Sequence, residues 1–158
     1  MLKLYRFNEN IKEYWETWAN DDGSHTVHWG ELGLQGNSKT VKSGLFKKAQ
    51  EKIQKEINEL IENGYQQAVH EYTLLIEYEV DGFGTSDDLD KRAKLQDRMN
   101  ETLGWTGLGH CDGGSIGSGT MEVCNRVVDF KVAKNVIEND LKGTEFDNYT
   151  RIYDENTK

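Results

Sequence analysis

Apolar and polar positions alternate in four short segments of the first half, after which the spacing becomes helical. The alternation predicts four strands, with a hairpin at Asp21-Asp22-Gly23-Ser24. Apolar residues then recur every three or four positions up to Gly64, which predicts one amphipathic helix over 45–63. The expected strands are 1–7, 11–19, 25–31 and 39–43, and the helix stripe is Leu45, Ala49, Ile53, Ile57, Leu60 and Ile61.

The second half alternates strands with two helices. Thr85 or Ser86 is suited to cap a helix that ends at Gly104, and Asp129 is suited to cap another that ends at Gly143. The order strand–helix–strand–strand–helix–strand is that of the ferredoxin-like plait, in which two helices cover one face of a four-stranded antiparallel sheet. The expected strands are 72–80, 107–116, 120–128 and 149–153. The helix stripes are Leu89, Ala93, Leu95, Met99 and Leu103, then Phe130, Ala133, Ile137 and Leu141.

These patterns predict an α+β protein of two domains. Residues 1–68 form a small antiparallel sheet packed on one long helix, and residues 69–158 form the plait. The boundary falls within 66–71, a short stretch that is not rich in Gly or Ser, so we expect the domains to touch. The second face of the plait is left open, and we expect Glu77, Glu79, Glu122 and Arg126 to lie on it.

Charge is divided unequally between the two halves. Residues 1–68 carry 9 Lys/Arg against 10 Asp/Glu, whereas residues 69–158 carry 10 against 18, which makes the net charge of the second half −8. An acidic surface repels phosphate, so any nucleic acid would bind the first half. No apolar run is long enough to span a bilayer and none resembles a secretory leader, so we expect a cytoplasmic protein with no membrane partner.

The cysteine content argues against a metal centre and a disulfide framework. Cys111 and Cys124 are the two cysteines, and in the cytosol such thiols stay reduced. Two cysteines without clustered histidines cannot close a structural zinc site. If Gly117-Ser118 is the hairpin turn, Cys111 lies opposite Cys124 and His110 opposite Asn125, unless a bulge at Gly113-Gly114 shifts the register.

A glycine-rich hairpin is the first candidate site. It contains His110, Cys111, Asp112, Gly113 and Gly114, and it matches neither a phosphate-binding loop nor a dinucleotide fingerprint, so no cofactor is expected. Consecutive strand residues point to opposite faces, which separates the histidine from the thiol it would have to activate. We therefore expect no enzymatic activity. Bare backbone in a strand marks a bulge or the close approach of another group.

Residues ~12–65 resemble the WGR domain. The resemblance rests on Tyr14-Trp15-Glu16, on Trp29-Gly30 and on a long helix that ends in Gly64-Tyr65. Gly33, Gly36 and Lys39 follow Trp29-Gly30 at the family's spacing. The resemblance covers roughly a third of the chain, and it is the combination of these features that is specific.

The resemblance implies a binding module, and one position departs from it. The family is best known from DNA-damage-responsive ADP-ribosyl polymerases, in which the Trp and Arg of the Trp-Gly-Arg triplet contact DNA near a strand break. It also occurs in bacterial regulators and small bacterial proteins. Trp29 matches the Trp, but Glu31 stands at the Arg position. An Arg fork pairs with phosphate in a bidentate way, whereas a carboxylate repels phosphate.

The second candidate site is the surface around Trp29, formed with Glu31, Lys39 and Lys42. In one interpretation the lysines make a basic patch beside an exposed indole. In the other, Trp29 is a core aromatic residue and the lysines are a solvated face. Both interpretations fit the sequence.

The leading functional hypothesis is a non-enzymatic bacterial binding, adaptor or regulatory protein, of which an immunity protein is one type, acting through protein–protein contacts. The alternative is nucleic-acid binding, at DNA ends, through Trp29 and the nearby lysines; acidity and Glu31 disfavour it. A small-molecule or enzymatic site in the glycine hairpin ranks last.

Overall fold

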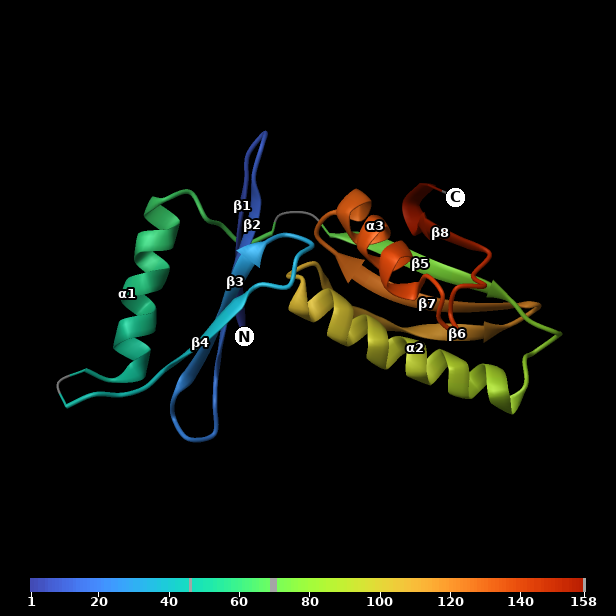
Figure 1. Cartoon of the computed structure of the whole chain (residues 1–158), viewed down its shortest axis with the longest axis horizontal. Helices are drawn as coiled ribbons and strands as arrows, with labels where there is room; N and C mark the ends of the chain where they lie inside the picture. The colour runs from blue at the N-terminus through green and yellow to red at the C-terminus, as the bar shows by residue number, and fades with distance from the viewer. Residues whose placement is uncertain (46, 69–70, 158) are drawn as a thin grey trace. The chain divides into compact units, whose positions relative to one another are not determined.

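The chain forms an α+β protein of two compact units, Met1–Val69 and His70–Lys158. The computed structural model describes residues 1–45, 47–68 and 71–157. Each unit is one antiparallel sheet with its own helical layer, as Figure 1 shows. Within the described residues, no helix is both long enough and apolar enough to cross a membrane.

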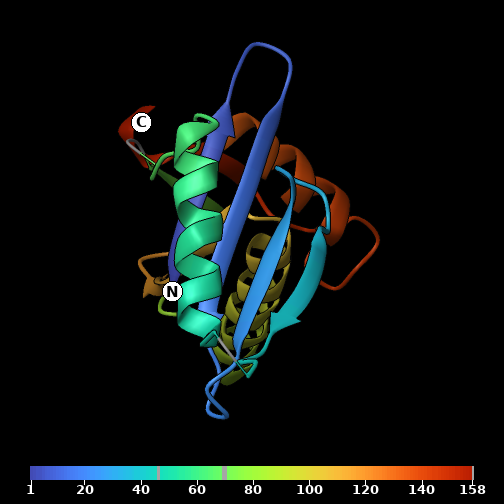
Figure 2. The ribbon, with the colours of Figure 1, turned by 90° about the vertical axis from the view of Figure 1, so that its left-hand side faces the viewer.

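The first unit is a four-stranded meander with one helix on one face. Its strands β1 (Leu2–Phe7), β2 (Lys12–Ala19), β3 (His25–Glu31) and β4 (Asn37–Val41) pair in chain order, and α1 (Ala49–Glu62) lies along the sheet (Figure 2). Side chains from three strands and the helix meet between the two layers, where they exclude water. The buried cluster consists of Leu4, Trp15, Val27 and Ile53.

Helix α1 is shorter than its apolar spacing predicts. It begins at Ala49, whose backbone N–H donates to the Ser43 hydroxyl at 3.0 Å. Leu45, expected in the apolar stripe, is 97% exposed, so the prediction of a helix from residue 45 is wrong. The last strand is displaced as well, because β4 spans Asn37–Val41 in place of the expected 39–43.

The second unit has the predicted ferredoxin-like topology. Its strands pair antiparallel in the order β6-β7-β5-β8, with two helices in the connections that skip one strand. The helices begin where the sequence predicts. The elements are β5 (Tyr72–Glu79), α2 (Ser86–Trp105), β6 (Gly109–Gly117), β7 (Thr120–Val127), α3 (Phe130–Leu141) and β8 (Arg151–Asp154).

Capping fixes the starts of both helices. The Thr85 hydroxyl accepts a hydrogen bond from the Asp88 N–H, and the Asp88 carboxylate accepts one from the Thr85 N–H, which is a complete capping box. Asp129 accepts from the Val132 N–H at 3.0 Å. The predicted stripe of α2 is wrong only in its first turns, because Leu89 and Ala93 are exposed. The buried helix residues are Leu95, Met99, Leu103, Ala133, Ile137 and Leu141.

The β6–β7 hairpin turns one residue later than expected. Ser118 and Gly119 are its central residues and have φ of +54° and +88°, as a type I′ turn requires. A bulge then shifts the register between Cys111 and Gly113. Cys111 consequently lies opposite Asn125 instead of Cys124, and the predicted pairing of the two cysteines is wrong.

Gly30, near the end of β3, and Gly36, in the loop that follows, are explained by the side chain of Tyr14. A Cβ atom on Gly36 would collide with the Trp29 carbonyl oxygen and with the Tyr14 hydroxyl. A Cβ atom on Gly30 would lie 2.9 Å from the Gly36 Cα and 3.3 Å from the same hydroxyl. The glycine spacing after Trp29 therefore lets the loop close over Tyr14.

We expect Gly36→Ala to destabilise the first unit by about 2 kcal/mol, because the added methyl group meets backbone and a buried phenol that cannot both move away. Urea unfolding followed by tryptophan fluorescence measures the loss. Gly44→Ala is the matched control, since the nearest atom to its new methyl group is the Lys52 Nζ at 3.5 Å, the end of a flexible chain. Equal losses in both variants would contradict this account of the loop.

Candidate functional site

Trp29 lies at the border of the core, with a lysine above its ring. It packs against the buried cluster beneath α1, and the Nζ of Lys39 is 5.5 Å from its ring centroid. Lys39 donates to both carboxylate oxygens of Glu56, each at 3.0 Å. The same carboxylate accepts from Trp15 Nε1 at 3.1 Å. The structure thus brings Trp29 and Lys39 together and neutralises the lysine with a carboxylate of α1.

The other two residues predicted for this surface are placed differently. Glu31 is exposed and shares the sheet face of Trp29, because the two are two positions apart on β3. Lys42 follows the end of β4, and β4 ends where Val41 pairs with His25 at the start of β3. Glu31 and Lys42 are therefore at opposite ends of the β3–β4 ladder, and the four residues do not form one basic patch.

A buried polar relay occupies the opposite face of the same sheet, and sequence reasoning missed it. Glu16 accepts from the Lys3 ammonium at 3.0 Å and from His28 Nδ1 at 2.7 Å. The other ring nitrogen of His28 is 3.1 Å from the Tyr14 hydroxyl. Tyr14, Glu16 and His28 are each at most 4% exposed. Tyr14 and Glu16 alternate with Trp15 along β2, and this alternation was the available signal.

One hydrogen bond of the relay has a defined direction. A carboxylate only accepts, so His28 Nδ1 carries the hydrogen that Glu16 receives. The Tyr14 hydroxyl lies within hydrogen-bond distance of His28 Nε2 and donates to the Leu34 carbonyl at 3.4 Å. Burial raises the pKa of Tyr14 to about 12, and the Glu16 charge adds to this effect. The phenol is therefore protonated at neutral pH. The relay links β1, β2 and β3, and its Tyr14 end lies under the loop that follows β3.

Tyr14 makes the stability of the first unit depend on alkaline pH. Because its pKa is raised in the folded state, its proton is lost more readily after unfolding, so its contribution is present below pH ~10 and is lost as the pH rises through ~12. We expect Tyr14→Phe, which cannot ionise, to lose less stability over this window than the parent protein. Urea unfolding at several alkaline pH values measures the difference. An equal dependence of the unfolding free energy on pH in the parent protein and in Tyr14→Phe would contradict the prediction. Tyr72→Phe in the second unit serves as the control.

The glycine hairpin divides its candidate residues between two faces. His110 lies opposite Arg126, and the Asp112 carboxylate is 3.8 Å from the Arg126 guanidinium. Cys111 lies opposite the fully buried Asn125 instead. This register agrees with the prediction that His110 and Cys111 face opposite ways.

Neither thiol has the environment of a nucleophile. Burial raises the pKa of Cys111. The Asp112 charge acts in the same direction, whereas a hydrogen bond with the Gly113 backbone acts against it. Burial likewise raises the pKa of Cys124. Both cysteines are free, and raised pKa values keep them as thiols at neutral pH.

Part of the bare backbone of β6 lies beside α2. A Cβ atom on Gly114 would lie 3.3 Å from Arg92 Cδ and 3.5 Å from Gln96 Nε2, and both residues belong to α2. The helix residue Asn100 also accepts a hydrogen bond from the Cys111 N–H at 3.0 Å. Gly113 and Gly114 thus lie beside a helix, and Gly114 remains exposed.

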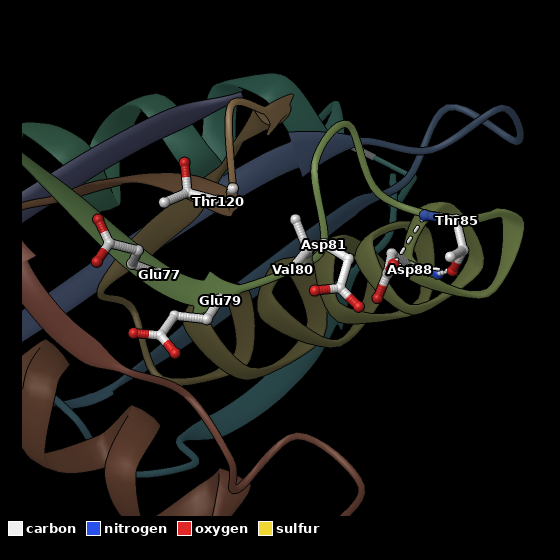
Figure 3. Close-up of a pocket in the computed structure, with 8 residues that line it drawn as sticks. Glu77, Glu79, Val80, Asp81, Thr85, Asp88 and Thr120 are labelled. Carbon is white, nitrogen blue, oxygen red and sulfur yellow. Dashed lines mark hydrogen bonds between the residues drawn. The ribbon is translucent and has the colours of Figure 1, made fainter.

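An acidic groove of about 570 Å³ lies at the end of β5, and no sequence argument predicted it (Figure 3). Glu77 is engaged by Arg151 at 2.9 and 2.8 Å, and Asp88 belongs to the capping box. Glu79 and Asp81 are exposed. The groove is lined by Glu77, Glu79, Val80, Asp81, Thr85, Asp88, Gly119 and Thr120.

In residues 1–45, 47–68 and 71–157, no three His, Cys, Asp or Glu side chains converge in a way that could hold a metal ion. Comparison of the chain with protein-family models, with curated proteins and with solved structures gave no match.

Proposed function

We propose that this protein is a non-enzymatic binding protein, of the adaptor or regulatory kind, whose partner is another protein. The observation that carries the proposal is the pairing of Lys39 with Glu56 over the Trp29 ring. The lysine over the indole is already neutralised, and Glu31 adds an exposed negative charge on the same face. A surface of an indole with balanced charges suits a protein interface better than a phosphate backbone.

The absence of enzymatic activity is part of the proposal. It is supported by the raised pKa of Cys111 and Cys124 and by the separation of His110 from the thiol. The two free thiols also support a cytoplasmic setting. The net charge of −8 in the second half disfavours phosphate there.

The proposal includes the likeness of residues ~12–65 to the WGR domain, and with it a bacterial binding module. The packing around Tyr14 supports this likeness, because the same side chain explains why glycine is needed at both position 30 and position 36. Trp29 and Lys39, which the likeness also uses, are side by side. The proposed role of the domain is to dock a partner.

Binding of DNA ends is the alternative, and the placement of Lys39 over Trp29 favours it, since single-stranded ends bind to aromatic platforms with nearby cations. It requires Lys39 to leave Glu56 when a phosphate arrives. The two hypotheses predict different responses to salt, because phosphate contacts weaken steeply as salt rises.

We expect the full chain to form a complex with a protein of its own cell that can be rebuilt from purified components. Affinity purification with the full chain followed by mass spectrometry identifies the candidate, and calorimetry on the purified pair measures Kd. Trp29→Ala should weaken this pair, whereas Trp105→Ala in the second unit is the matched control. If the purified pair does not associate, or if its Kd is unchanged by both substitutions, the result would argue against the proposal for this surface.

We expect the parent protein not to bind nicked or blunt DNA at about 50 mM salt, and Glu31→Arg to create salt-dependent binding, because it supplies the Arg of the family triplet. Fluorescence anisotropy measures both. Glu51→Arg makes the same charge change on exposed α1 and is the control. Salt-dependent binding by the parent protein that Trp29→Ala weakens would favour the alternative function, and equal effects of the two Arg variants would remove the assigned role of position 31.

A further inference from the structure

Phe83 is an exposed aromatic side chain on a rigid loop of the second unit. Its residue is 83% exposed, and it lies in the connection between β5 and α2. The glycines on both sides, Gly82 and Gly84, have φ of +58° and +79°, a backbone conformation that other residues rarely adopt. This loop, residues 81–85, is called the Phe83 loop below.

Backbone hydrogen bonds attach the Phe83 loop to the β6–β7 turn. The Gly119 N–H donates to the Gly82 carbonyl at 2.7 Å, and the Val80 N–H donates to the Gly119 carbonyl at 3.0 Å. Within the loop, the Gly84 N–H donates to the Asp81 carbonyl at 2.8 Å. The Thr85 capping box then fixes the point where the loop enters α2. Phe83 is therefore presented by a backbone that is held on both sides.

The turn of the hairpin extends the apolar surface beside this loop. A Cβ atom on Gly117 would lie 3.6 Å from Phe83 Cδ1, so the ring lies next to bare backbone. Ile116 packs so closely over Gly84 that a Cβ atom there would collide with its end. Preorganised aromatic anchors lose little conformational entropy on binding, which is the cost that weakens flexible contacts.

The charged residues that line the groove beside the anchor are all acidic. Glu79 and Asp81 are exposed carboxylates of this groove, and Asp88 lines it as well (Figure 3). Asp87 adds a fourth acid in the first turn of α2. A partner that covers Phe83 must therefore bring cations to its rim, because like charges brought together at an interface oppose binding.

We infer that the Phe83 loop and the acidic groove form a docking surface for a basic amphipathic segment of a partner protein. An apolar side chain of the segment packs on Phe83 and Ile116, and its Lys or Arg side chains enter the groove towards Glu79 and Asp81. The inference rests on the proposed function, since it names the class of segment that a protein partner would supply. It assigns a surface distinct from the one around Trp29.

The probe for this surface is a short peptide of leucine and lysine, patterned as an amphipathic helix of about four turns. Two control peptides replace its leucines by serine or its lysines by glutamate. Amide chemical shifts of the ¹⁵N-labelled full chain report where and how tightly each peptide binds. We expect the leucine–lysine peptide to shift the amides of 81–85 and 116–120, and to bind more tightly than either control.

Substitutions on the exposed surface separate the apolar contact from the charge. We expect Phe83→Ser to weaken the probe by about tenfold or more, and Trp105→Ser, at another exposed aromatic residue of the unit, to have little effect. Glu79→Gln with Asp81→Asn should weaken binding and reduce its salt dependence, whereas Asp90→Asn with Asp97→Asn should do so much less. These sites are exposed, so folding is retained, and the unperturbed amide spectrum checks it.

Three outcomes would overturn the inference: equal binding of the serine–lysine peptide, shifts spread over the acidic surface, or no effect of Phe83→Ser. Each leaves the proposed function intact if the purified partner still binds and responds to Trp29→Ala. Conversely, a chain that binds the probe through Phe83 but binds DNA in place of any protein would remove the proposed function without removing this surface.

Discussion

The first unit depends on the position of one buried phenol. Tyr14 projects from β2 beside Gly30 of β3 and under the loop that follows β3, where Gly36 has no side chain to obstruct it. Its hydroxyl is hydrogen-bonded to His28, and His28 is hydrogen-bonded to Glu16. The position of the loop, the packing of this sheet face and the placement of the buried carboxylate therefore depend on one another. In the low dielectric of a protein interior, leaving one member of such a network without a hydrogen bond costs stability. A substitution at either glycine that moved Tyr14 would therefore also disturb its polar partners.

The fold class and most elements could be predicted because their signals are local. Thr85 and Asp129 cap helices through neighbouring backbone groups, and strand alternation needs only neighbouring residues. Register could not be predicted in the same way. Gly117-Ser118 and Ser118-Gly119 are both acceptable turn pairs, and the choice depends on how the whole hairpin packs. Leu45 was misassigned because spacing alone does not show where a helix meets its sheet.

The candidate site was predictable in part. The sequence placed Trp29 and Lys39 near one another, but the charge of that surface depends on Glu56, which lies on a helix and reaches β4 only in the folded unit. The pairing of Glu16 with His28 depends in the same way on the β2–β3 register. Such partners are separated along the chain, and a single sequence does not show which separated residues are close in space. The composition shows that the protein is acidic as a whole. The contacts of Lys39 with Glu56 show that positive and negative charges are paired beside Trp29.

Helix α2 has a further effect on the outer edge of its sheet. Strand β6 is an edge strand, and an unpaired edge is a template on which another chain can add a strand. Asn100 occupies the Cys111 N–H of that edge, and the bulge interrupts its register. A state in which α2 has melted while the strands persist therefore exposes a glycine-rich edge on which the bulge alone is left to oppose intermolecular pairing. Protection of this edge thus depends on the local stability of one helix.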